Sequence, residues 1–139
     1  MLHYRITTRT VDGQLVVRCP ALPEVFTYAD SRHEARELAV DALITCLQER
    51  IRRREDIPEG EAPHAGRTVA LPTLVEAKVA VWRALRAEGK TKAALARTLK
   101  SNQKQIDRLL DLRHVSPLPQ IDAALDALGR RVTMMVEPA

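Results

Sequence analysis

The chain has 139 residues, 45% of them hydrophobic but only 3% aromatic, so its core has to be built from aliphatic side chains. This length accommodates one ordinary domain or two small ones. No apolar run approaches the roughly 18 residues of a membrane span, and the first residues, MLHYRITTR, lack the apolar centre of a signal peptide. We therefore expect a cytoplasmic protein with no membrane partner.

The formal net charge of +4 is unevenly distributed along the chain. Residues 1–72 hold 10 Lys and Arg against 11 Asp and Glu, whereas residues 73–139 hold 12 against 7. Residues 90–113 alone carry seven basic and two acidic side chains. Such a local excess of positive charge favours binding to a polyanion, which makes this segment the first candidate for a functional site.

The N-terminal residues predict a small sheet. Residues 2–8 and 14–19 are β-leaning runs separated by Asp12-Gly13, a pair that adopts the positive φ angles of a tight hairpin turn. Residues 25–28 suit a third strand, and the prolines that precede it place it at a sheet edge. Three strands are expected before the first helix.

A long amphipathic helix is expected next. Ser31 and Glu34 have the spacing of a capping box, and apolar residues then recur every three or four positions as far as Ile51. Four arginines follow at its end, Arg50 and Arg52 to Arg54. They are either a solvated helix end favoured by the helix dipole or a contact for RNA or a partner, and we favour the solvated interpretation.

Residues 57–66, IPEGEAPHAG, contain two prolines, two glycines and two glutamates, a composition typical of a linker. The sequence therefore predicts one domain over residues 1–66 and a second over residues 67–139. Residues 67–71 can add one more short strand, giving a β-β-β-α-β order in the first half.

Signals for catalysis and metal binding are few. The four histidines are scattered, and neither a glycine-rich phosphate loop nor an HExxH motif is present. Cys19 and Cys46 lack CxxC spacing, so we interpret them as small apolar side chains in preference to a disulfide or a reactive thiol. No enzymatic activity, cofactor or metal is predicted.

The second half is predicted to be helical. A capping box at Thr73 and Glu76 opens a helix that Gly89 ends, and Trp82 lies in its apolar stripe as a core residue in preference to a stacking platform. A further helix spans residues 120–128. Residues 130–137 are β-like and are expected to pair with strand 67–71, with another copy of the chain, or with both, which predicts an oligomer.

The basic segment has the pattern of a helix-turn-helix. Thr91 caps a helix over residues 92–99, residues 100–102 form the turn, and a second helix spans residues 103–110. Ala96 and Ile106 supply a small and a branched side chain where the two helices cross. Lys100 occupies a turn position where glycine is easier to accommodate.

The polar side chains of this segment suit DNA. Gln pairs with adenine, Arg and Lys pair with guanine, and all of them hold phosphates. The predicted DNA-binding residues are Lys92, Lys100, Asn102, Gln103, Lys104, Gln105 and Arg108. Two alternatives stay open: a plain helical hairpin with a solvated face, and a capping role for Asn102.

The order and spacing of several blocks resemble the HicB family of antitoxins from toxin–antitoxin systems. The blocks are DGQLVVRCPALPEVFTYADSRHEA, ARELAVDALITCLQ, the IP of IPEG, LPTLVEAKVAVWRAL, ALARTLKSNQKQIDRLLDLRH and ALDALGRRVTMMV. They cover nearly the whole chain. Departures from the family pattern are Arg18 and Cys19, the helix end QERIRRRED, which lacks aromatic residues, and Lys100.

This resemblance implies an α+β protein. Its N-terminal domain would have a partial, degenerate ribonuclease H-like fold that binds and masks a HicA-type mRNA-cleaving toxin. Its C-terminal helix-turn-helix domain, ending in a short strand, would bind operator DNA as a homodimer or as a tetramer. The alternative is a stand-alone helix-turn-helix regulator whose N-terminal domain senses a small molecule or another partner.

Overall fold

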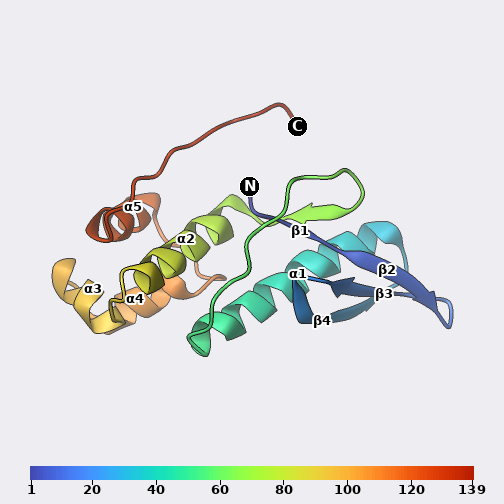
Figure 1. The fold of residues 1–139 in the computed structure, drawn as a ribbon, viewed down its shortest axis with the longest axis horizontal. Coiled ribbons are helices and arrows are strands. Elements are labelled where there is room, and N and C mark those ends of the chain that lie inside the picture. The colour runs from blue at the N-terminus through green and yellow to red at the C-terminus, as the bar shows by residue number, and fades with distance from the viewer. The chain divides into compact units, whose positions relative to one another are not determined.

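The computed structural model describes all 139 residues, which divide into two compact units, residues 1–76 and 77–139. The first contains β1 (His3–Arg5), β2 (Thr7–Val11), β3 (Gln14–Cys19), β4 (Leu22–Ala29), α1 (Arg32–Arg52) and β5 (Thr68–Ala70) (Figure 1). Helix α2 (Thr73–Ala87) follows, and then α3 (Lys92–Thr98), α4 (Gln103–Leu110) and α5 (Leu118–Ala127). The predicted α+β class is confirmed. None of these helices is both long and apolar enough to cross a membrane.

Strands β2, β3 and β4 form a three-stranded antiparallel sheet in that order. The predicted hairpin turn joins β2 to β3, with Asp12 at φ 51° and Gly13 at φ 79°. Strand β4 lies at an edge of this sheet, as predicted. A register irregularity at Arg18 and Cys19 interrupts the β3–β4 pairing.

The first predicted strand is divided into two, because its residues serve two sheets. Strand β1 pairs antiparallel with β5, Tyr4 lying opposite Val69, whereas β2 pairs with β3. Between them, the Ile6 N–H donates to the Arg67 carbonyl over 2.9 Å. Tyr4 and Ile6 are buried, but all of β2 is exposed.

One predicted partner of β5 was the C-terminal segment, residues 130–137. In the structure β5 pairs with β1 and not with this segment. Residues 130–139 form neither a helix nor a strand, so the predicted terminal strand is absent from the single chain. Four of their side chains, Val132, Met134, Met135 and Val136, are exposed. A lone β-like segment has no neighbour here whose N–H and C=O groups it can pair.

The predicted linker, residues 57–66, has no helix or strand but is held against β1. Ile57 is buried, the Tyr4 hydroxyl donates to the Pro58 carbonyl over 2.7 Å, and the Glu61 N–H donates to the His3 carbonyl over 2.8 Å. A side chain at Gly60 would begin 2.5 Å from Leu2 Cδ1. Because this segment and β5 both attach to β1, the first unit extends to Glu76, beyond the predicted boundary at residue 66.

Helix α1 begins at the predicted cap and covers the sheet. The Glu34 N–H donates to Ser31 Oγ over 3.2 Å, and the Glu34 carboxylate accepts from the Asp30 N–H. The helix packs along β3 and β4 (Figure 1), where Val17, Leu22 and Val25 are fully buried. The buried residues of α1 are Ala35, Ala39, Leu43, Ile44, Leu47 and Ile51.

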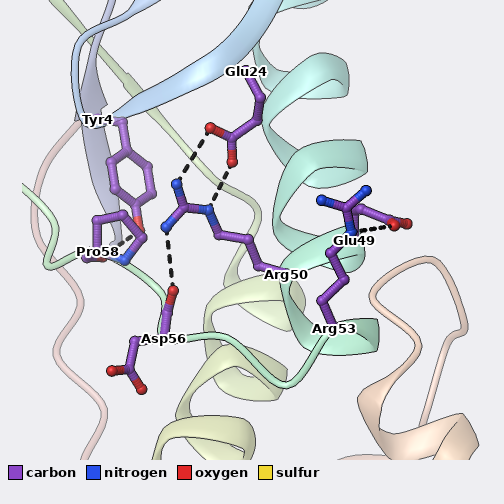
Figure 2. Close-up of polar contacts among 7 residues, drawn as sticks. All are labelled: Tyr4, Glu24, Glu49, Arg50, Arg53, Asp56 and Pro58. Atoms are coloured by element: carbon purple, nitrogen blue, oxygen red, sulfur yellow. Dashed lines mark hydrogen bonds and ion pairs between the residues drawn. The ribbon is translucent and has the colours of Figure 1, made fainter.

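The basic end of α1 is engaged within the first unit. Figure 2 shows the Arg50 guanidinium bonded to both Glu24 carboxylate oxygens, at 2.7 and 3.3 Å, and to the Asp56 carbonyl. Arg52 and Arg53 both pair with Glu49, which lies three and four positions before them, at 3.0 and 2.9 Å. These contacts agree with the interpretation of the run as an ordinary helix end.

Both cysteines are free thiols. Cys19 is buried and Cys46 is half-buried, and burial raises the pKa of each thiol. Since the thiolate is the reactive form, these environments fit the predicted role as small apolar side chains.

The second unit has a helical core. Val79, Val81, Trp82 and Leu85 of α2 are buried, which confirms the core interpretation of Trp82, and the Arg86 guanidinium lies 5.4 Å from its ring centroid. The further buried residues of this unit include Leu95, Ile106, Leu109, Ile121, Leu125 and Leu128. Glu76, the last residue of the first unit, was predicted to cap the start of α2. Its carboxylate instead accepts from the Leu2 N–H over 2.8 Å.

The Glu24–Arg50 pair predicts acid sensitivity of the first unit. The hydrogen bond from Arg50 lowers the pKa of Glu24 below its ordinary 4.5. The carboxylate thus stabilises the fold above that value and loses this contribution as the pH falls through the lowered pKa. Because the pair is partly exposed, we expect Glu24→Gln to lower the free energy of unfolding by only about 0.5–1 kcal/mol at pH 7.

Urea unfolding at pH 7 and at pH 3 measures this effect. The difference between wild type and Glu24→Gln should shrink at the lower pH. A difference that is the same at both pH values would contradict the assignment.

Candidate nucleic-acid interface

Helix α3 begins and ends at the predicted residues, within one position. Gly89, at φ 62°, ends α2, and the Thr91 hydroxyl then accepts from the Ala94 N–H over 3.0 Å as the cap of α3. Leu95 and Ala96 face inward and are buried. The two helices α3 and α4 pack against each other, and we refer to residues 91–110 as the α3–α4 pair.

The turn between the helices places Lys100 in a left-handed conformation, at φ 52°. The Lys100 N–H donates to the Arg97 carbonyl over 3.1 Å, and the Ser101 N–H donates to the Ala96 carbonyl over 2.8 Å. These two bonds are those of a Schellman motif, in which glycine is the usual residue at the left-handed position. Lys100 therefore bears a conformational cost that the sequence had indicated.

Helix α4 spans the predicted residues, and Asn102 caps it. The Asn102 side-chain oxygen accepts from the Gln105 N–H over 3.0 Å. Asn102 therefore has the capping role that was one of the two alternatives for it. Ile106, Leu109 and Leu110 are buried, whereas the polar residues of the helix lie on its other side, so the helix is amphipathic.

The exposed face of α4 collects most of the predicted DNA-binding residues. Gln103, Lys104 and Arg108 are exposed, and Gln105 is half-buried. Lys100 and Asn102 are exposed at the N-terminal end of the helix. Lys92 differs, because its ammonium is bound to the Asp107 carboxylate at 2.9 Å and ties α3 to α4.

A buried lysine beneath α4 was missed by the sequence analysis. Lys78 of α2 has no exposed surface, and its Nζ donates to the Arg108 carbonyl over 2.8 Å and to Ser116 Oγ over 2.7 Å. Arg108 lies in the last turn of α4, where carbonyls have few partners within the helix, and its carbonyl also accepts from the Asp111 N–H over 3.3 Å. Lys78 thus donates a hydrogen bond to a carbonyl at the C-terminal end of α4, and Asn102 caps the N-terminal end.

One signal in the sequence could have drawn attention to Lys78. It lies between Val75 and Val79 on the apolar side of α2, next to Trp82, where a lysine is unexpected in a buried stripe. The acceptors could not be foreseen, because they lie 30 and 38 residues further along the chain.

No group of three or more His, Cys, Asp or Glu side chains is placed to hold a metal ion. The exposed side chains of α4 carry amide, ammonium and guanidinium groups on a short helix that side chains hold at both ends. The class defined by the fold is a small, two-unit α+β protein whose helical unit carries this basic helix pair.

Comparison with known proteins identifies the family. Residues 3–80 match the family model of the HicB-like antitoxin of bacterial toxin–antitoxin systems. Antitoxin HicB of Pseudomonas fluorescens strain Pf0-1 is 36% identical over 141 residues, an alignment that covers 100% of this chain and 97% of that protein. The chain belongs to the HicB-like antitoxin family, which confirms the resemblance seen in the sequence.

Two further relatives support this assignment over the whole length. Antitoxin HicB 1 of Photorhabdus laumondii is 31% identical over 137 residues, covering 98% of this chain and 88% of that protein. Antitoxin HicB of Escherichia coli strain K12 is 27% identical, covering 97% and 99% respectively. Because the family model stops at residue 80, the relation of the α3–α4 pair to this family rests on these full-length relatives.

We expect burial of Lys78 to make stability rise at alkaline pH. Desolvation lowers the pKa of Lys78 below 10.5, while the nearby Asp111 opposes the shift. Between the lowered pKa and 10.5 the unfolded chain binds more protons, so the free energy of unfolding increases with pH across this window. The neutral amine keeps two N–H donors for its two acceptors.

Lys78→Met is the matched control, since it keeps a long side chain without a titrating group. Urea unfolding of both proteins from pH 8 to pH 10.5 should show a rise in the wild type relative to the variant. Parallel pH profiles would show that Lys78 is not desolvated as described.

The strained turn gives a separate prediction. Lys100→Gly removes the contact between Cβ and the backbone and should raise the free energy of unfolding by about 1 kcal/mol. Lys100→Ala, which keeps the strain and removes the ammonium, should leave stability nearly unchanged. Thermal or urea unfolding distinguishes these outcomes, and equal stabilisation by both variants would assign the effect to charge.

Proposed function

We propose that this chain is the antitoxin of a toxin–antitoxin pair, acting through its two units. The first unit binds and neutralises a HicA-type mRNA-cleaving toxin, and the second represses the shared operon by binding operator DNA. The observation that carries the proposal is the combination of family membership with an exposed, basic α4 fixed at both ends. Both targets place its action in the cytoplasm.

The exposed face of α4 suits the major groove of DNA. Gln103 and Arg108 offer paired donors to base edges, while Lys100, Lys104 and Asn102 lie where phosphate groups flank an inserted helix. Gln105, half-buried, contributes at the rim of this face. Lys92 acts from α3, where its bond to Asp107 leaves it partly neutralised.

Operator binding is proposed to involve a homodimer, with a tetramer as the larger assembly. The exposed Val132, Met134, Met135 and Val136 form a β-like segment that lacks a partner strand in the single chain. Two copies pairing these segments antiparallel would satisfy their backbone groups and bury their apolar side chains. A two-fold assembly of this kind reads an inverted repeat with half-sites about one helical turn apart.

Toxin neutralisation is tested by co-expression with the adjacent reading frame. We expect growth arrest when that reading frame is expressed alone and rescue when this chain is co-expressed. Co-purification of the two proteins should accompany the rescue. Growth that stays arrested despite soluble expression of both proteins would remove the antitoxin half of the proposal and favour a stand-alone regulator.

Operator recognition is tested by binding to the upstream DNA and to a scrambled duplex at physiological salt. Gln103→Ala and Arg108→Ala should each lower the preference for the operator by about tenfold, because base contacts are lost. Lys100→Ala should weaken binding to both duplexes alike and reduce the salt dependence by about one phosphate contact. Equal loss on both duplexes for all three variants would contradict these roles.

A further inference from the structure

The sheet of the first unit has one face that α1 does not cover (Figure 1). Side chains alternate between the two faces of a sheet, and the buried Val17 and Val25 point toward α1. On the opposite side the register places Arg18 between Thr7 and Phe26, and Val16 between Arg9 and Tyr28. We call these six residues the outer face.

The outer face holds half of the aromatic residues of the chain. The sequence has one Trp, two Tyr and one Phe. Tyr4 and Trp82 are buried, whereas Phe26 is 47% and Tyr28 is 50% exposed. Because the chain has so few aromatic residues, we do not interpret these two adjacent exposed rings as residues left over from the core.

The rings and an arginine form a continuous platform. The Arg18 guanidinium carbon lies 4.8 Å from the Phe26 ring centroid. The Phe26 and Tyr28 centroids are 5.0 Å apart, with their planes at 88°. One ring therefore presents its edge to the other, and the guanidinium and the exposed part of the Tyr28 ring remain as flat surfaces for stacking.

The charge of this face is positive. Its six residues include Arg9 and Arg18 and no carboxylate. The nearby Glu24 is already bound to Arg50, and Asp30 accepts from the Gln14 side chain and lies beyond the end of β4. A second copy docked on the same face would bring these arginines together, whereas a phosphate backbone complements them.

We propose that the outer face binds single-stranded nucleic acid. Bases stack on the exposed part of the Tyr28 ring and on the Arg18 guanidinium that lies over the Phe26 ring, and the Arg9 guanidinium holds a backbone phosphate beside them. Flat aromatic groups beside arginines on an open sheet are the chemistry by which unpaired bases are bound without sequence preference. This activity is separate from duplex recognition by α4 and from toxin binding.

Fluorescence polarisation of the full chain with labelled oligouridylate and oligothymidylate of about 12 nucleotides tests the proposal. The double variant Phe26→Leu/Tyr28→Leu should weaken binding by about tenfold or more, because a stacked base contributes roughly 1–3 kcal/mol. Arg18→Gln should weaken it less and reduce its salt dependence. Circular dichroism and thermal unfolding establish that each variant is folded.

Two controls separate this site from the rest of the protein. Arg32→Gln removes an exposed arginine from α1 and should leave oligonucleotide binding unchanged. Lys104→Ala/Arg108→Ala should weaken operator binding but not oligonucleotide binding. If that second-unit variant abolishes oligonucleotide binding, or if the aromatic variant and Arg18→Gln bind like wild type, the proposal is wrong.

A further outcome would assign the outer face to a protein partner. Loss of toxin neutralisation in the aromatic variant, with oligonucleotide binding unchanged, would overturn the nucleic-acid proposal and leave the antitoxin function intact. Conversely, failure of toxin neutralisation or operator binding by the wild-type chain leaves the oligonucleotide measurement interpretable by itself.

Discussion

The buried ammonium of Lys78 fixes the surface on which the proposed recognition depends. An eight-residue helix is too short to be stable by itself in water, so α4 relies on its buried face and on its ends. Asn102 caps the N-terminal end of α4. At the C-terminal end, Lys78 donates to the Arg108 carbonyl and to the Ser116 hydroxyl. The side chain of Arg108 faces solvent while its backbone is held from beneath, so a base-reading group would start from a fixed position.

The N-terminal segment has a comparable role in the first unit. Residues 3–11 supply one strand to β5 and another to the β2–β3–β4 sheet. Tyr4 then holds the segment after α1 through the Pro58 carbonyl (Figure 2), and the residues of the predicted linker become part of the packed unit. Polarity and proline content indicated a linker, but backbone hydrogen bonds to a neighbouring strand do not depend on side-chain composition.

The regular elements were largely foreseeable because local physics determines them. Asp12-Gly13 made the hairpin, Ser31, Thr91 and Asn102 capped their helices, and the period of the apolar residues set which faces are buried. Lys100 was identified as an unusual turn residue and adopts a left-handed backbone. The partner of β5 and the hydrogen-bond partner of Glu76 differ from the predictions, and the burial of Lys78 was not foreseen; all three are long-range relations.

By itself, the sequence determined the α+β class, the positions of the helices and the concentration of positive charge in residues 90–113, because propensity, capping and charge act between near neighbours. Only the tertiary structure decided which strand pairs with β5, that Lys92 is bound to Asp107, and that two arginines and two aromatic rings share one open face of the sheet. Such relations join residues far apart in the chain. They follow from strand register and helix packing, which no short stretch of sequence specifies.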